Sequence, residues 1–74
     1  MTVTTRRTQN ERRTQTIAKL VDATIATLLE EGYAHTTVSA ICGRAGVSHG
    51  GLFRHFESLM DLIMAAADEV ASTS

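Results

Sequence analysis

Apolar residues follow a helical period along the first half of the chain. Starting at Ile17, one helix face is predicted to carry Ile17, Leu20, Val21, Thr24, Ile25, Leu28 and Leu29. Thr24 is the only polar residue among these seven. Gly32 follows two glutamates and suits the left-handed backbone that ends a helix. The pattern predicts a first helix over residues 10–31, preceded by a flexible polar arm over residues 1–10.

Two short helices joined by a glycine turn are predicted in the middle of the chain. The hydroxyl of Thr37, or of the threonine before it, can accept a hydrogen bond at the start of a helix over residues 38–44. Gly46 interrupts this helix, since glycine adopts the positive φ that a tight turn requires. Ser48 can then cap a third helix over residues 49–56. The inner face expected for the first of the two helices consists of Val38, Ile41, Cys42 and Ala45.

A fourth helix is predicted to begin at Ser58 and to fade within residues 72–74. Ser58 and Asp61 have the spacing of an acidic capping box. The apolar residues of this helix are too many for one face, so either it packs on something further or part of its surface is exposed. These residues are Leu59, Met60, Leu62, Ile63, Met64, Ala66 and Ala67. No strand pattern is found, and the predicted fold class is all-α, a small helical bundle.

Residues 37–56 have the pattern of a helix-turn-helix. Ala40 and Ala45 are small enough for two short helices to cross closely, and Gly46 makes the turn between them. The apolar residues expected to fill the angle are Ile41, Val47 and Leu52. In a DNA-binding helix-turn-helix the second helix enters the major groove. Helical hairpins that bind no nucleic acid share this spacing, so the pattern alone leaves both interpretations open.

The residues of this region also resemble a known family. The matching motifs are Thr36-Thr-Val-x-x-Ile, Arg44-Ala-Gly-Val-Ser, Gly50, Leu52-Phe-Arg-His-Phe-x-Ser58 and Leu62. They look like the DNA-binding region of the TetR (tetracycline repressor) family of bacterial transcriptional regulators, over residues 13–67. The resemblance implies a homeodomain-like three-helix core plus the start of a fourth helix. Residues 11–57 are then expected to form the DNA-binding domain, and residues 58–74 to lead to an effector and dimerisation domain.

The resemblance implies which residues touch DNA. Thr37 matches a phosphate contact, and a helix N-terminus with a hydroxyl is a suitable phosphate site. Ser48, His49 and Gly50 open the helix whose side chains reach base edges while its backbone comes close to DNA. The other matched positions are Ser39, Phe53, Arg54 and His55.

Four departures from the family pattern bear on these contacts. Ser39 replaces a long base-reading residue, so readout from its helix should be weak. Phe53 replaces a tyrosine, which removes a hydrogen bond to phosphate and keeps the ring packing. Leu59 and Met60 replace a lysine and a glutamate, and the lysine typically grips phosphate. Gly51 adds a second glycine inside a helix, expected to cost about 0.5–1 kcal/mol relative to alanine.

Charge is distributed unevenly along the chain. The total of −1 combines +3 over residues 1–13, −2 over residues 14–35, +1 over residues 36–57 and −3 over residues 58–74. By default a basic start is a solvated surface, but beside a helix-turn-helix such arms reach phosphates or the minor groove. Arg12 and Arg13 are therefore added to the candidate DNA-binding residues. The total charge does not count against a DNA partner.

Other kinds of site find little support in the sequence. A single cysteine excludes an internal disulfide, and no apolar run is long enough for a membrane span or a signal peptide. His49 and His55 do not share a helix face, so no metal site is expected. Ser48 is not activated by its neighbour, and the glycines lack the context of a phosphate-binding loop. We expect a cytoplasmic protein without catalysis, cofactor or metal.

The expected function is sequence-specific binding of double-stranded DNA by a transcriptional regulator of the TetR type, acting as a repressor. Its partner would be one half-site of a palindromic operator, and homodimerisation and inducer binding would need a C-terminal domain beyond residue 74. The alternative is a small helical protein–protein interaction module, or a truncated product, that binds no operator DNA by itself. Salt-sensitive DNA binding would separate the two.

Overall fold

The computed structural model describes residues 9–73, with side chains for residues 13–72, and all its regular elements are helices. In chain order they are α1 (Gln9–Glu31), the 3-10 turn η1 (Tyr33–His35), α2 (Val38–Ala45), α3 (His49–His55) and α4 (Leu59–Thr73). The predicted all-α class is confirmed, and each predicted helix is present. The predicted arm over residues 1–10 lies outside the described residues, apart from residues 9 and 10, which belong to α1.

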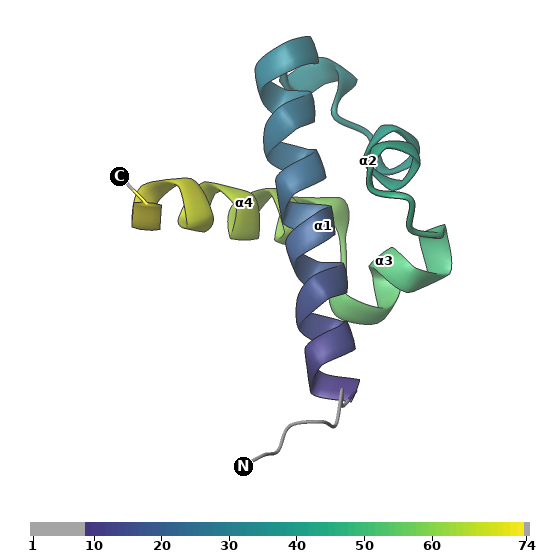
Figure 1. Cartoon of the computed structure of the whole chain (residues 1–74). Coiled ribbons are helices and arrows are strands. Elements are labelled where there is room, and N and C mark those ends of the chain that lie inside the picture. The colour runs from purple at the N-terminus through teal and green to yellow at the C-terminus, as the bar shows by residue number, and fades with distance from the viewer. Residues whose placement is uncertain (1–8, 74) are drawn as a thin grey trace.

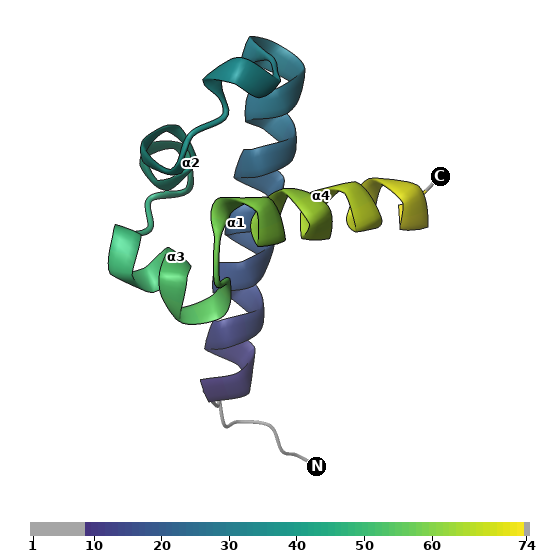
Figure 2. The ribbon, with the colours of Figure 1, turned by 180° about the vertical axis from the view of Figure 1, so that it is seen from behind.

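Helix α1 is the long axis on which the other helices are arranged (Figure 1). The short helices α2 and α3 lie on one side of it, while α4 crosses it and carries the C-terminus away on the opposite side (Figures 1 and 2). Along this axis, α2 lies at the level of the C-terminal half of α1 and α3 at the level of its N-terminal half. None of the helices within residues 9–73 combines the length and apolar character needed to cross a bilayer.

The core forms where α1, α2, α3 and α4 meet. Its completely buried large aliphatic side chains are Leu20, Ile41, Leu52 and Leu62. Val38, Ala45, Val47 and Phe56 are partly buried and pack against this cluster. The apolar positions predicted for the helix-turn-helix are therefore confirmed as one continuous core.

The predicted inner face of α1 is right at its centre and wrong at its C-terminal end. Leu20 is completely buried, but Leu29 is 82 % exposed. Nine residues make about two and a half turns of helix, so these two side chains point in opposite directions. Thr24 is buried as predicted, and Thr27, which the pattern leaves out, is buried as well. Their hydroxyls donate hydrogen bonds to the carbonyls four residues earlier, at 2.8 and 2.7 Å. Burial costs these hydroxyls little because each has a partner.

Glycine ends α1 by a different route from the one predicted. Gly32 has φ of 88° and ψ of 167°, which is an extended rather than a left-handed helical conformation. Only glycine adopts this region readily, so the residue type is explained. The chain then makes η1, which the sequence pattern does not predict. Thr36 closes the connection by donating its hydroxyl to the carbonyl of Gly32 at 2.8 Å.

Helix α4 starts with the predicted cap. The hydroxyl of Ser58 accepts a hydrogen bond from the backbone N–H of Asp61, and the Asp61 carboxylate accepts one from the N–H of Glu57, both at 3.2 Å. Leu62 and Ala66 are completely buried in the core, and α4 packs chiefly on α1. The apolar residues that remain more than about half exposed on this helix are Met60, Met64 and Val70. Part of the apolar surface of α4 is thus open to solvent.

Candidate nucleic-acid interface

Helix α2 begins at the predicted threonine cap. Thr37 has an extended backbone, and its hydroxyl oxygen accepts a hydrogen bond from the N–H of Ala40 at 3.2 Å. The side chains of Thr37 and Ser39 are exposed in this first turn. A hydroxyl beside the positive end of a helix dipole is suited to a phosphate oxygen. The geometry that the sequence predicted for this position is therefore present.

Gly46 makes the turn between α2 and α3. Its φ of 72° and ψ of 31° are left-handed, as predicted, and the N–H groups of Gly46 and Val47 both donate to the carbonyl of Cys42 at 2.9 and 3.1 Å. A side chain with a β-carbon adopts this conformation only with strain. Burial raises the pKa of the Cys42 thiol, which keeps it protonated and unreactive at neutral pH.

Helix α3 begins at the predicted serine cap. The hydroxyl oxygen of Ser48 accepts a hydrogen bond from the N–H of Gly51 at 3.0 Å. Ser48 remains exposed, so its hydroxyl proton can still be donated outward. Ser48 thus caps the start of α3, and the DNA contact expected for it remains a prediction.

The outward side of α3 brings together most of the predicted base-reading positions. His49 and Phe53 are four residues apart, as are Gly50 and Arg54, so the two pairs lie on neighbouring rows of the same helix. All four residues are exposed, whereas Leu52 on the opposite side is completely buried. We call this set, His49, Gly50, Phe53 and Arg54, the exposed face of α3.

The predicted site residues His55 and Arg13 also lie away from this face. His55 is half-buried at the end of α3 and does not share the exposed rows. Arg13 is exposed in the first half of α1, the half beside α3, while the side chain of Arg12 lies outside the described residues. A basic start of α1 is therefore on the same half of the molecule as α3.

Two glycines inside α3 differ in their surroundings. A β-carbon built at Gly50 would meet nothing closer than the Ser48 hydroxyl oxygen at 4.0 Å. One built at Gly51 would lie 2.9 Å from Cγ1 of Val47 and 3.2 Å from the same hydroxyl oxygen. The advantage of alanine over glycine that the sequence predicted at Gly51 is therefore offset by a contact that forces Val47 to move.

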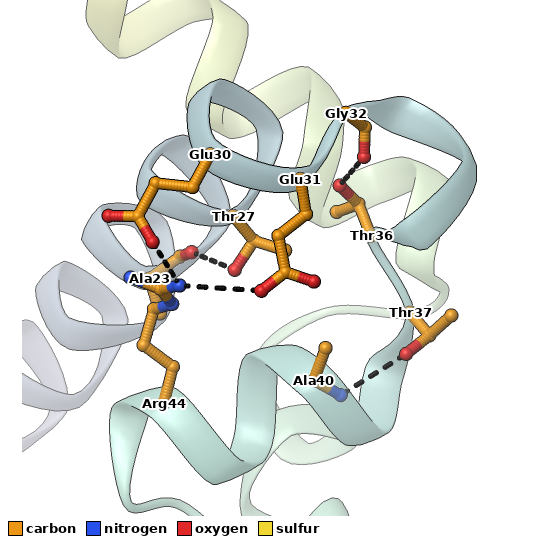
Figure 3. A network of polar contacts seen from close by, with 9 residues as sticks. All are labelled: Ala23, Thr27, Glu30, Glu31, Gly32, Thr36, Thr37, Ala40 and Arg44. Atoms are coloured by element: carbon orange, nitrogen blue, oxygen red, sulfur yellow. Dashed lines mark hydrogen bonds and ion pairs between the residues drawn. The ribbon is translucent and has the colours of Figure 1, made fainter.

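An ion pair between α1 and α2 was not predicted from the sequence. Nη2 of Arg44 donates a hydrogen bond to Oε1 of Glu30 at 2.7 Å and lies 3.8 Å from Oε2 of Glu31 (Figure 3). The hydrogen bond and the charge of Arg44 hold the pKa of Glu30 below its ordinary value, and the hydrogen bond from Glu30 raises the pKa of Arg44. Both shifts favour the charged forms, so the pair is ionised at neutral pH.

The described residues contain no group of side chains of metal-binding type. Within residues 9–73, no three side chains of histidine, cysteine, aspartate or glutamate lie close enough to hold a metal ion. The three features with geometry for recognition are the N-terminus of α2, the exposed face of α3 and the basic start of α1. Together they describe an exposed helix accompanied by hydroxyl groups and by cations.

Comparison with protein families gives one match that covers this region. The model of the family described as "Bacterial regulatory proteins, tetR family" matches residues 20–66, which include the C-terminal half of α1, all of α2 and α3 and the first half of α4. Comparison with solved structures gave no significant match.

Curated relatives give the same result at the level of sequence. An uncharacterized HTH-type transcriptional regulator of Mycobacterium tuberculosis is 52 % identical over 64 residues, which are 86 % of this chain and 33 % of the relative. The HTH-type transcriptional regulator CymR of Pseudomonas putida is 42 % identical over 60 residues, 81 % of this chain and 30 % of CymR. TtgR of the same species is 32 % identical over 68 residues, 92 % of this chain and 32 % of TtgR. The chain thus spans about a third of the length of these relatives.

Proposed function

The chain belongs to the tetR family of bacterial regulatory proteins, and from this premise we propose that it binds double-stranded DNA sequence-specifically and regulates transcription as a repressor. The exposed face of α3 carries this proposal, because an exposed helix held by a glycine turn against a capped helix is the arrangement that enters a major groove. The protein would act in the cytoplasm, and the exposed face of α3 would bind the operator. No catalytic step or cofactor belongs to the proposal.

Each proposed contact follows from the position of a side chain. His49, Gly50, Phe53 and Arg54 would face the groove, with Ser48 at its edge. Thr37 and Ser39 would face a phosphate at the N-terminus of α2, and His55 would lie against the backbone at the end of α3. Arg12 and Arg13 would meet phosphates or the minor groove from α1.

The domain organisation is part of the proposal. Residues 11–57 would form the DNA-binding domain, and residues 58–74 would lead into an effector and dimerisation domain. The relatives are about three times as long as this chain, which leaves room for such a domain in a whole protein. Two DNA-binding domains would then occupy the two half-sites of a palindrome, whereas one alone should bind weakly.

Removing the charge of Arg54 tests the proposal. We expect Arg54→Ala to weaken binding to a duplex selected in vitro by about five- to a hundredfold, since a guanidinium contact to a base contributes about 1–3 kcal/mol. Fluorescence anisotropy at two salt concentrations measures the loss. Lys19→Ala on α1 is the matched control, because it removes the same charge from a side chain that lines the groove beside the end of α2 and is not on the exposed face of α3. A wild-type affinity for DNA that is the same at both salt concentrations would refute the DNA proposal and favour a protein–protein interaction module.

The arginines at the start of the chain should contribute to DNA binding independently of the DNA sequence. We expect glutamine at positions 6, 7, 12 and 13 to weaken binding to selected and random duplexes by the same factor, because phosphate contacts carry no sequence information. The salt dependence of the binding constant should become shallower by about one unit for each phosphate that is no longer neutralised by an arginine. A weakening confined to the selected duplex would show instead that these arginines read bases.

A further inference from the structure

The ends of α1 and α2 are joined by a charged cluster on one side of the fold. Arg44 lies in the last turn of α2, while Glu30 and Glu31 lie in the last turn of α1. Figure 3 shows both carboxylates directed at the Arg44 guanidinium, with the capping contacts of Thr37 and Thr36 nearby. The Arg44 side chain therefore bridges α2 and α1, and its partner Glu30 lies 14 positions earlier in the sequence.

The last turn of α2 faces α1 through small apolar side chains. An open groove of about 430 Å³ separates α1 from the end of α2. Its lining residues are Lys19, Asp22, Ala23, Ala26, Arg44 and Ala45. The three alanines offer only methyl groups across the groove, and the buried side chains of α2, Ile41 and Cys42, lie before its last turn ends. At the groove, the long side chain of Arg44 makes the polar contact that spans the two helices.

The position of α3 depends on how α2 lies on α1. Helix α3 has a single buried side chain, Leu52, and packs mainly on α2. Helix α2, in contrast, packs extensively on α1. A tilt of α2 into the groove would therefore carry Gly46 and α3 with it. Such a tilt would change the distance between the exposed face of α3 and the basic start of α1.

We infer that Arg44 is a positioning residue of the DNA-binding surface, which sets the orientation of α2 and α3 on α1 through its ion pairs with Glu30 and Glu31. The expected effect on DNA binding rests on the proposed function, because the angle between α1 and α3 affects binding when both helices contact one duplex. It assigns Arg44 no contact with DNA. Both acceptors that its guanidinium faces are carboxylates of the protein itself.

The orientation of the helices can be measured without DNA. Residual dipolar couplings of the backbone amides in α1 and α3 should fit one alignment tensor in the wild-type chain. In Arg44→Glu they should need two tensors, because the cluster then carries three like charges that repel one another. The double variant Glu30→Arg with Arg44→Glu should return to one tensor with the wild-type angle. A single tensor and an unchanged angle between α1 and α3 in Arg44→Glu would overturn the inference. If the Arg44→Glu variant does not fold, the measurement is made on Arg44→Gln.

DNA binding of the same variants separates positioning from direct contact. We expect Arg44→Glu to weaken binding about tenfold and the charge-swapped double variant to return to within about threefold of wild type, with the wild-type salt slope. Lys19→Gln, which changes the charge of the same groove, should change binding less than Arg44→Gln. A double variant that stays as weak as Arg44→Glu would mean that Arg44 touches phosphate and would overturn the inference. Absence of all DNA binding in the wild type would instead refute the proposed function, and the dipolar couplings would still decide the orientation.

Discussion

Leu52→Ala is expected to unfold most of the molecules at room temperature. Leu52 is completely buried and is the single buried side chain of α3, so its truncation leaves a cavity where α3 meets the core. A buried leucine truncated to alanine costs about 2–5 kcal/mol. A chain of 74 residues rarely has more than about 3–5 kcal/mol of stability in total. Urea unfolding followed by circular dichroism at 222 nm, where helices give a strong signal, would measure the difference.

The adjacent residue provides the matched control. Phe53 is 48 % exposed, and Phe53→Ala should lower the free energy of unfolding by about 1 kcal/mol or less. The same substitution should nevertheless weaken DNA binding, because Phe53 belongs to the exposed face of α3. Equal destabilisation by the two substitutions would mean that both sides of α3 are packed. It would remove the exposed face on which the proposed function depends.

Features that depend on near neighbours in the chain are predictable from the sequence. The caps at Thr37, Ser48 and Ser58 each need a hydroxyl and a backbone N–H three residues later, and all three hydrogen bonds are present. Gly46 is predictable for the same reason, since a left-handed turn favours one residue type. The boundaries of the four helices follow from these local signals to within a residue or two.

Features that depend on how the helices pack are not predictable in this way. The partners Glu30 and Arg44 carry charges that any solvated helix end could carry, and nothing in their spacing indicates that they meet. The apolar period places Leu29 on the inner face because a pattern of threes and fours drifts around the helix over several turns. The contact between a β-carbon at position 51 and Val47 depends on the angle of the turn, which no local motif encodes. Which site residues touch DNA stays a prediction.

Helix α3 is held from outside rather than by its own helix propensity. It has seven residues, and isolated helices shorter than about 12–15 residues are marginal in water. Two of those seven are glycines, which lower the propensity further. The Ser48 cap, the buried Leu52 and the packing on α2 therefore provide its stability. A glycine that weakens α3 without a structural reason is then a candidate for a functional one.

Gly50→Ala is expected to raise stability and to abolish most DNA binding. Space around position 50 is open, so alanine should increase the free energy of unfolding by about 0.5–1 kcal/mol through its helix propensity. Gly50 also lies on the exposed face of α3, where the proposed complex brings the bare backbone against base edges. An added methyl group would hold α3 out of the groove, and we expect affinity for a selected duplex to fall at least about tenfold. Thermal unfolding and fluorescence anisotropy on one preparation give both numbers.

Gly51→Ala is the control that separates these two effects. A β-carbon there meets Val47 at 2.9 Å, so the gain in propensity is offset and stability should stay level or fall. If Gly50→Ala leaves DNA binding unchanged, the backbone at Gly50 does not approach DNA, and readout must come from the side chains of His49, Phe53 and Arg54 alone. If Gly50→Ala raises the free energy of unfolding while DNA binding falls, the glycine is retained for recognition, because alanine at this position would make the fold more stable.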